Sequence, residues 1–275
     1  DHLETPGHVR FDDYHYDLNF LKRYYIDYSH SLTGHEWLSL FFENHDNPRM
    51  SSKVNPDPAL REPLSKLLLS ILLMLKGTPF LFQGQELGRG NQDFSSLDEF
   101  RDVESLNKYK ALLEEGKSEK EALAVLLAGS RDHSRIVMAW DDGPNGGFST
   151  VEPWIRQDAL YKDVNVESQR GDADSVWRFT QDLIRLRRST PGFAYADIRF
   201  LEEARKDCFC FERVIKKEQS ESADFSPCAI RVEMNLSAER KSFPTIRGAE
   251  LLLCNYAHEA APNSFEPYEV RVWRY

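Results

Sequence analysis

Two short apolar segments separated by one helix constrain the fold of this chain most strongly. Residues 37–44 read WLSLFFEN and residues 78–82 read TPFLF, and polar side chains follow each of them. Between them, residues 58–76 have the composition of a buried helix, with Pro58 suited to its first turn and Gly77 to a left-handed C-terminal position. Because strand, helix, strand is a parallel crossover, binding groups are expected at the carboxyl ends of both strands.

The remaining patterns predict an α/β part followed by an all-β part. Helical spacing of apolar residues predicts helices at 17–31, 103–115 and 174–190. A further helix is predicted to start at Ser118, which can form a capping box with Glu121. Short apolar strands separated by polar turns are predicted at 207–215, 228–237, 250–256 and 269–275. The sequence therefore predicts a domain boundary near residue 190 and a small antiparallel sandwich after it.

Composition excludes several classes of partner. The formal charge is −10 and no long basic run occurs, which argues against nucleic acid and anionic membranes. The longest apolar run, residues 67–77, is about half of what a bilayer requires. The cysteines lack paired CxxC spacing, so thiols in a cytoplasmic protein are expected rather than a zinc site, and no secretory leader is visible at Asp1. We expect neither a metal nor a cofactor.

Asn44 ends the first apolar segment, and His45 and Asp46 follow it directly. A carboxylate beside an imidazole in a cleft can hold sugar hydroxyls or stabilise a developing cation, whereas a local turn before Pro48 is the alternative. On local grounds Asp46 also pairs with Glu86, which follows the neighbouring strand, because two nearby carboxylates are the minimum for glycoside hydrolysis.

A second polar group lies in the segment SRDHSRIVMAW, residues 130–140. Arg131 is suited either to donate to substrate hydroxyls or to form an ion pair that fixes a long loop. Trp154 provides an aromatic ring for stacking on a sugar or for ordinary packing.

Six motifs together carry a resemblance to a known family. In chain order they are FFENHDNPR, LKGTPFLFQGQELG, LDEFRDVESLNKY, SRDHSRIVMAW, GGFSTVEPWI and FEPYEVRVWRY. They resemble the later part of the alpha-amylase family (glycoside hydrolase family 13), and within it the oligo-1,6-glucosidase and alpha-glucosidase group. The resemblance implies a partial TIM (β/α)8 barrel over residues 1–190, from the end of strand six to helix eight. A long insertion at about 89–173 and a β-sandwich domain at 191–275 complete the expected architecture.

The resemblance also assigns roles to residues. Asp46 is expected to stabilise the transition state, and His45, Arg131, Asn44 and Arg49 to bind substrate. The nucleophile and the acid/base are expected to lie upstream of this chain, as is the aspartate that pairs with Arg131. This replaces the pairing of Asp46 with Glu86 and implies that the chain alone is inactive.

The implied function is a retaining, exo-acting alpha-glucosidase that hydrolyses α-1,6 bonds, with α-1,4 bonds as a second option, in isomaltose-like oligosaccharides. The full-length enzyme is expected to be a cytoplasmic monomer. A trehalose-6-phosphate hydrolase, a sucrose isomerase and a non-catalytic amylase-like binding protein are the alternatives. Arg49, Lys53 and Arg89 are the candidates for a phosphate pocket. Linkage preference is open because residues 135–140 read RIVMAW, where the group usually has RTPMQW.

Overall fold

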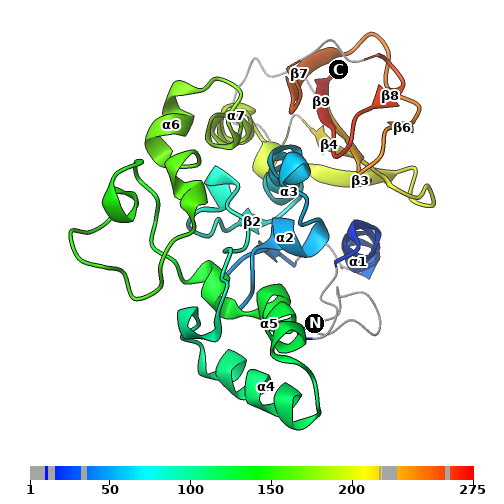
Figure 1. The fold of residues 1–275 in the computed structure, drawn as a ribbon. Helices are drawn as coiled ribbons and strands as arrows, with labels where there is room; N and C mark the ends of the chain where they lie inside the picture. Colours follow the sequence, from blue (N-terminus) through cyan, green and yellow to red (C-terminus); the bar gives the residue numbers. More distant parts are fainter. Residues whose placement is uncertain (1–9, 12–15, 32–35, 217, 219–227, 258–260) are drawn as a thin grey trace. The chain divides into compact units, whose positions relative to one another are not determined.

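A computed structural model describes residues 10–11, 16–31, 36–216, 218, 228–257 and 261–275 (Figure 1). The chain forms two compact units, each built from several stretches of sequence. Unit 1 comprises 1–17, 42–57 and 81–177, and unit 2 comprises 18–41, 58–80 and 178–275. These units follow contacts rather than chain order, and the division at residue 190 stays a prediction.

Unit 2 contains the expected parallel crossover. Strand β1 (Ser39–Leu40) pairs in parallel with β2 (Thr78–Pro79), and helix α3 (Arg61–Met74) connects them after a short 3₁₀ turn, η1 (Pro58–Leu60). Both strands are shorter than predicted. Within the described residues each strand has only the other as a partner, and Pro79 has no N–H to donate.

Gly77 has a different role from the predicted helix cap. Helix α3 ends at Met74 with Leu75 already extended, and Gly77 has φ +145°. A Cβ at Gly77 would lie 2.6 Å from the carbonyl oxygen of Leu38. The glycine is therefore required by the close approach of two backbones rather than by the end of the helix.

Two arginines satisfy the last carbonyls of α3, which have no partner inside the helix. Arg187, on helix α7 (Val176–Ser189), donates to the carbonyl oxygens of Leu73 at 2.6 Å and Leu75 at 3.1 Å. Arg213 is buried and donates to Met74 O at 2.8 Å. Burial lowers the pKa of Arg213 to about 9.

The C-terminal part is an antiparallel five-stranded sheet with the order β3-β4-β5-β9-β7. The strands are β3 (Asp197–Leu201), β4 (Cys208–Ile215), β5 (Cys228–Asn235), β7 (Glu250–Cys254) and β9 (Val270–Arg274). A two-stranded ladder, β6 (Lys241–Ser242) with β8 (Ser264–Phe265), accompanies it. The four strands predicted from the sequence are confirmed, whereas β3, β6 and β8 were missed. Packing of Phe243 and Phe265 against Cys208 and Cys210 provides one apolar cluster of this part, and all four cysteines are free thiols.

Helix α1 (Leu18–Ser31) of unit 2 has the predicted bounds to within one residue. Unit 1 contains α2 (Met50–Val54), α4 (Val103–Glu114), α5 (Glu119–Gly129) and α6 (Val166–Gly171). The predicted capping box between Ser118 and Glu121 is present. Phe94, Phe100, Leu126, Ile136 and Ile155 form the apolar cluster that supports the loops of unit 1. Among the described helices, none is both long and apolar enough to cross a membrane.

Candidate functional site

Asn44 shapes the turn that carries the candidate carboxylate. Its side-chain oxygen accepts hydrogen bonds from the backbone N–H of Asp46 at 2.9 Å and from the side chain of Asn47 at 3.1 Å. A local turn therefore does precede Pro48, and the amide oxygen of Asn44 is engaged inside it, whereas the binding role of the triplet stays a prediction. The turn leaves the side chains of His45 and Asp46 exposed, with 51% of the Asp46 side chain accessible.

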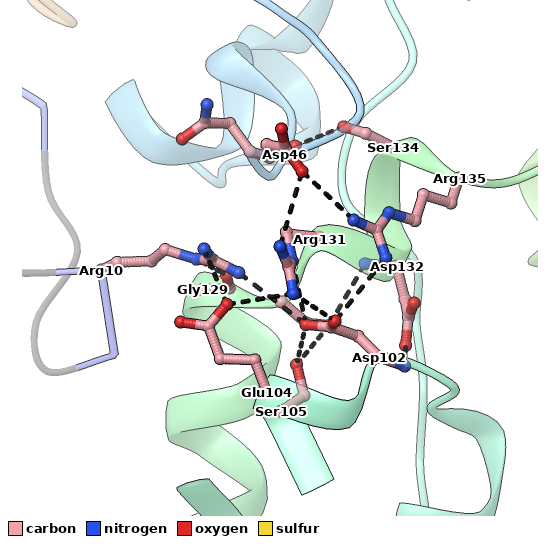
Figure 2. Close-up of polar contacts among 12 residues, drawn as sticks. Arg10, Asp46, Asp102, Glu104, Ser105, Gly129, Arg131, Asp132, Ser134 and Arg135 are labelled. Atoms are coloured by element: carbon pink, nitrogen blue, oxygen red, sulfur yellow. Dashed lines mark hydrogen bonds and ion pairs between the residues drawn. The ribbon is translucent and has the colours of Figure 1, made fainter. Parts of the chain in front are cut away.

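Two arginines face one oxygen of Asp46 (Figure 2). Oδ1 of Asp46 lies 3.3 Å from Nη2 of Arg135 and 3.5 Å from Nη1 of Arg131. Oδ2 lies 3.3 Å from Nε2 of His45. Charge-assisted hydrogen bonds are usually about 2.7–2.9 Å long, so these contacts are longer than usual, and the exposed half of the carboxylate is accessible to a ligand.

Asp102 fixes the orientation of Arg131. The Asp102 side chain is 2% exposed and accepts from Arg131 Nη2 at 2.6 Å and from Nε at 3.2 Å, which is a two-point grip. Burial by itself raises the pKa of Asp102, but the hydrogen bonds and charge of Arg131, together with the hydrogen bond from Ser105 and the charge of Arg135, outweigh it and the pKa is lowered. Asp102 thus supplies a carboxylate partner for Arg131 within this chain, and the expectation that a further aspartate partner lies upstream stays a prediction.

A buried carboxylate in turn positions Asp102. Asp132 accepts from the backbone N–H groups of Arg101 at 2.7 Å and Asp102 at 2.9 Å, directly before helix α4. Ser134 donates to the carbonyl oxygen of Asn47 at 2.6 Å. The segment 131–135 is therefore joined both to the start of α4 and to the turn that carries Asp46 (Figure 2).

Arg135 is the principal site residue that sequence reasoning did not assign to the site. Besides its contact with Asp46, its Nε donates to the carbonyl oxygen of His45 at 2.9 Å. Its guanidinium also lies 3.6 Å from Asp102. An arginine four residues after Arg131, separated from it by one 3₁₀ turn, η4 (Arg131–Ser134), was the available signal.

Arg49 is buried, which differs from its predicted contact with substrate. Its guanidinium donates to Glu43 at 2.9 Å and to the carbonyl oxygen of Gln83 at 2.8 Å. Glu43 also accepts from the backbone N–H of Met50 at 2.9 Å. The ion pair of Arg49 with Glu43 connects the two ends of the loop 43–50. Arg49 therefore stabilises the turn and does not present its charge to solvent.

Glu86 does not pair with Asp46. It lies on the 3₁₀ turn η2 (Gln85–Leu87) and, among the described residues, makes no hydrogen bond or ion pair with Asp46. Burial raises the pKa of Glu86. The structure is thus consistent with the resemblance, which had already replaced this pairing.

His133 is a structural residue in spite of its place between the two site arginines. It is fully buried, accepts from Gln92 N at 2.9 Å through Nδ1, and has Nε2 3.0 Å from Leu127 O. Because Leu127 offers only an oxygen, Nε2 carries the proton.

A pH-dependent contribution to stability is expected from His133. Burial lowers its pKa to about 3, whereas an unfolded histidine titrates near about 6.5. Between those two pKa values the unfolded chain binds one more proton than the folded chain. The free energy of unfolding therefore falls as the pH drops through this window, and the contribution of neutral His133 to stability is complete only above it. His133→Gln should show a shallower pH slope of the unfolding free energy in urea titrations. His30→Gln, which replaces an exposed ring, is the control, and equal slopes for wild type and His133→Gln would contradict the assignment.

Comparison with known proteins now defines the family. Residues 4–196 match the alpha amylase catalytic domain. The chain is 31% identical over 278 residues to probable oligo-1,6-glucosidase 2 of Bacillus subtilis (strain 168), covering 98% of this chain and 48% of that protein. These matches show that the chain belongs to the alpha-amylase family.

Solved structures agree with this membership. The crystal structure of Bacillus licheniformis trehalose-6-phosphate hydrolase superposes with a TM-score of 0.87 at 30% identity, covering 99% of this chain and 49% of that one. Isomaltulose synthase from Klebsiella sp. LX3 gives a TM-score of 0.82 at 26% identity, covering 94% and 46%. The chain spans about half the length of the curated relatives it matches.

Proposed function

We propose that this chain carries the transition-state-stabilising carboxylate of a retaining, exo-acting alpha-glucosidase that hydrolyses α-1,6 bonds of short oligosaccharides, with α-1,4 bonds as a second option. The observation that carries the proposal is the half-exposed Asp46 carboxylate, which two guanidinium groups hold at 3.3 and 3.5 Å. An ionised oxygen pair of this kind stabilises the positive charge that develops on a sugar ring during glycoside cleavage.

In this proposal His45, Arg131 and Arg135 bind the sugar around Asp46, while Asn44 and Arg49 hold the turn in shape. Strands β1 and β2 are proposed to be strands seven and eight of a TIM barrel. The β-rich C-terminal part is proposed to be a sandwich domain. The nucleophile and the acid/base are proposed to come from polypeptide outside residues 1–275. The full enzyme is proposed to be a cytoplasmic monomer.

Burial of the candidate phosphate-binding cations favours an unphosphorylated substrate over trehalose 6-phosphate. Arg49 is paired with Glu43, and Arg89 is paired with Asp158 at 2.7 Å with both side chains buried. Lys53 is 5% exposed. A phosphate pocket needs cations that reach the ligand, and these three residues are buried.

The test is product analysis with an enzyme that contains this chain and whatever polypeptide completes it. We expect release of glucose from isomaltose and no turnover of trehalose 6-phosphate. Turnover of trehalose 6-phosphate alone would replace the proposal with the phosphate hydrolase, and isomerisation of sucrose would replace it with the isomerase. Saccharide binding without any turnover would establish the non-catalytic alternative.

A further inference from the structure

A cavity of about 230 Å³ lies in unit 2 and shares no residue with the candidate site. Its walls include Ser29 of α1, Trp37 before β1, Lys76 after α3 and Asp197 of β3. Cavities for drug-sized ligands usually have volumes of about 300–1,000 Å³, so this one fits a smaller molecule. Apolar and polar groups both line it, which suits a ligand with an apolar face and polar edges.

One wall carries Trp37, which packs against a second exposed ring. Trp37 lines the cavity and is 45% exposed, and the ring of Tyr195, 66% exposed, lies 5.6 Å from it between centroids. The indole N–H of Trp37 donates to Thr78 Oγ1 at 2.8 Å, which fixes the ring orientation. An indole held in place at the cavity, with a second exposed ring packed against it, forms an apolar surface that costs little ordering entropy when a ligand binds.

A separated donor and acceptor face the same cavity. Lys76 Nζ lies 3.9 Å from Oδ1 of Asp197, which is beyond hydrogen-bond distance, whereas Oδ2 of Asp197 accepts from Lys216 Nζ at 2.6 Å. The hydrogen bond from Lys216 lowers the pKa of Asp197 and keeps it ionised. A hydroxyl group both donates and accepts, so one hydroxyl, or two adjacent ones, satisfies Lys76 and Asp197 together.

The charges around the cavity favour a neutral ligand. Lys76 and Lys216 offset the carboxylates of Asp197 and Glu36, so neither an anion nor a cation gains a net attraction. An apolar peptide side chain would remove Lys76 and Oδ1 of Asp197 from water without offering either a hydrogen bond, which is costly. We propose that this cavity is a non-catalytic binding site for one hexose unit of a neutral saccharide, with Trp37 against the ring and Lys76 and Asp197 on its hydroxyl groups.

The experiment is a titration of the ¹⁵N-labelled chain with glucose and with isomaltose, followed through the indole N–H signal of Trp37. The signal is assigned by its loss in Trp37→Phe. We expect a saturable shift with a dissociation constant on the order of 1 mM. Asp197→Asn, which keeps the side-chain size, should weaken binding about tenfold, the equivalent of one hydrogen bond to a charged group. Tyr195→Ala, an exposed truncation that keeps the reporter, should weaken it several-fold.

The control separates this site from the candidate catalytic site. Asp46→Asn should leave the Trp37 titration unchanged, and glycerol, which has hydroxyl groups but no ring, should not reproduce the shift. Absence of a saturable shift, or equal affinity in wild type and Asp197→Asn, would overturn the inference. Either result leaves the glucosidase proposal standing, since that proposal is tested by product release and by Asp46.

Discussion

Asp46→Asn is expected to lower turnover by roughly 10²- to 10³-fold, the size found when one electrostatic contact to a transition state is lost, in any active enzyme that contains this chain. The amide keeps the shape of the side chain but removes the negative charge. Asp46 is half exposed and its contacts to Arg131 and Arg135 are 3.3 Å or longer, so the fold should be retained. Steady-state kinetics with isomaltose provide the measurement.

Asp163→Asn provides a matched control, because this exposed aspartate lies outside the cluster around Asp46. Its turnover should equal that of the wild type, and the circular dichroism of both variants should be unchanged. If Asp46→Asn retained full turnover, the role assigned to this carboxylate would be wrong. A fall in kcat with little change in KM is the pattern expected for an interaction that acts mainly in the transition state.

Glu43→Ala is expected to destabilise unit 1 by about 3–5 kcal/mol, because it leaves the buried guanidinium of Arg49 without its carboxylate. The side chains of Glu43 and Arg49 are 4% and 1% exposed, and their contact is 2.9 Å long. Glu43 also accepts from the backbone N–H of Met50, so the same change should loosen the turn that carries Asp46. Urea denaturation followed by circular dichroism measures the loss.

Two further variants test whether the loss of stability comes from the unpaired buried charge or from the loss of any carboxylate. Glu43→Leu combined with Arg49→Met removes both charges and should recover much of the lost stability, as replacement of a buried ion pair by apolar residues often does. Glu104→Ala removes a half-exposed carboxylate from Arg131 and should cost less than about 1 kcal/mol. Equal losses for Glu43→Ala and Glu104→Ala would contradict the importance of burial.

Local signals predicted the regular elements well. The helices α1, α4, α5 and α7 and the strands β4, β5, β7 and β9 lie where apolar spacing and capping residues placed them. Strands β6 and β8 have two residues each, too few to show a period, and β3 begins directly after the 3₁₀ turn η7 (Phe193–Tyr195). Elements this short form because a neighbouring strand supplies their hydrogen bonds, which no local pattern records.

The site was only partly predictable for the same reason. Asp46 and Arg131 were identified from motifs, but Asp102 and Arg135 were not assigned to the site, although both lie within quoted motifs. Asp102 and Arg131 are far apart in sequence, and only the folded loops bring them to 2.6 Å. For Arg49 the sequence predicted too much: because it lies beside the motif, it was expected to bind substrate, but its side chain is buried.

The sequence by itself determined the polar triplet after an apolar strand, the periodicity of the helices and the resemblance to the alpha-amylase family, since these depend on residues close together along the chain. The tertiary structure decided which cations face Asp46 and which are buried, since burial and charge pairing depend on segments that meet only after folding. FFENHDNPR thus predicts the candidate carboxylate, Asp46, and the contacts of Asp102, Arg131 and Arg135 specify how it is held.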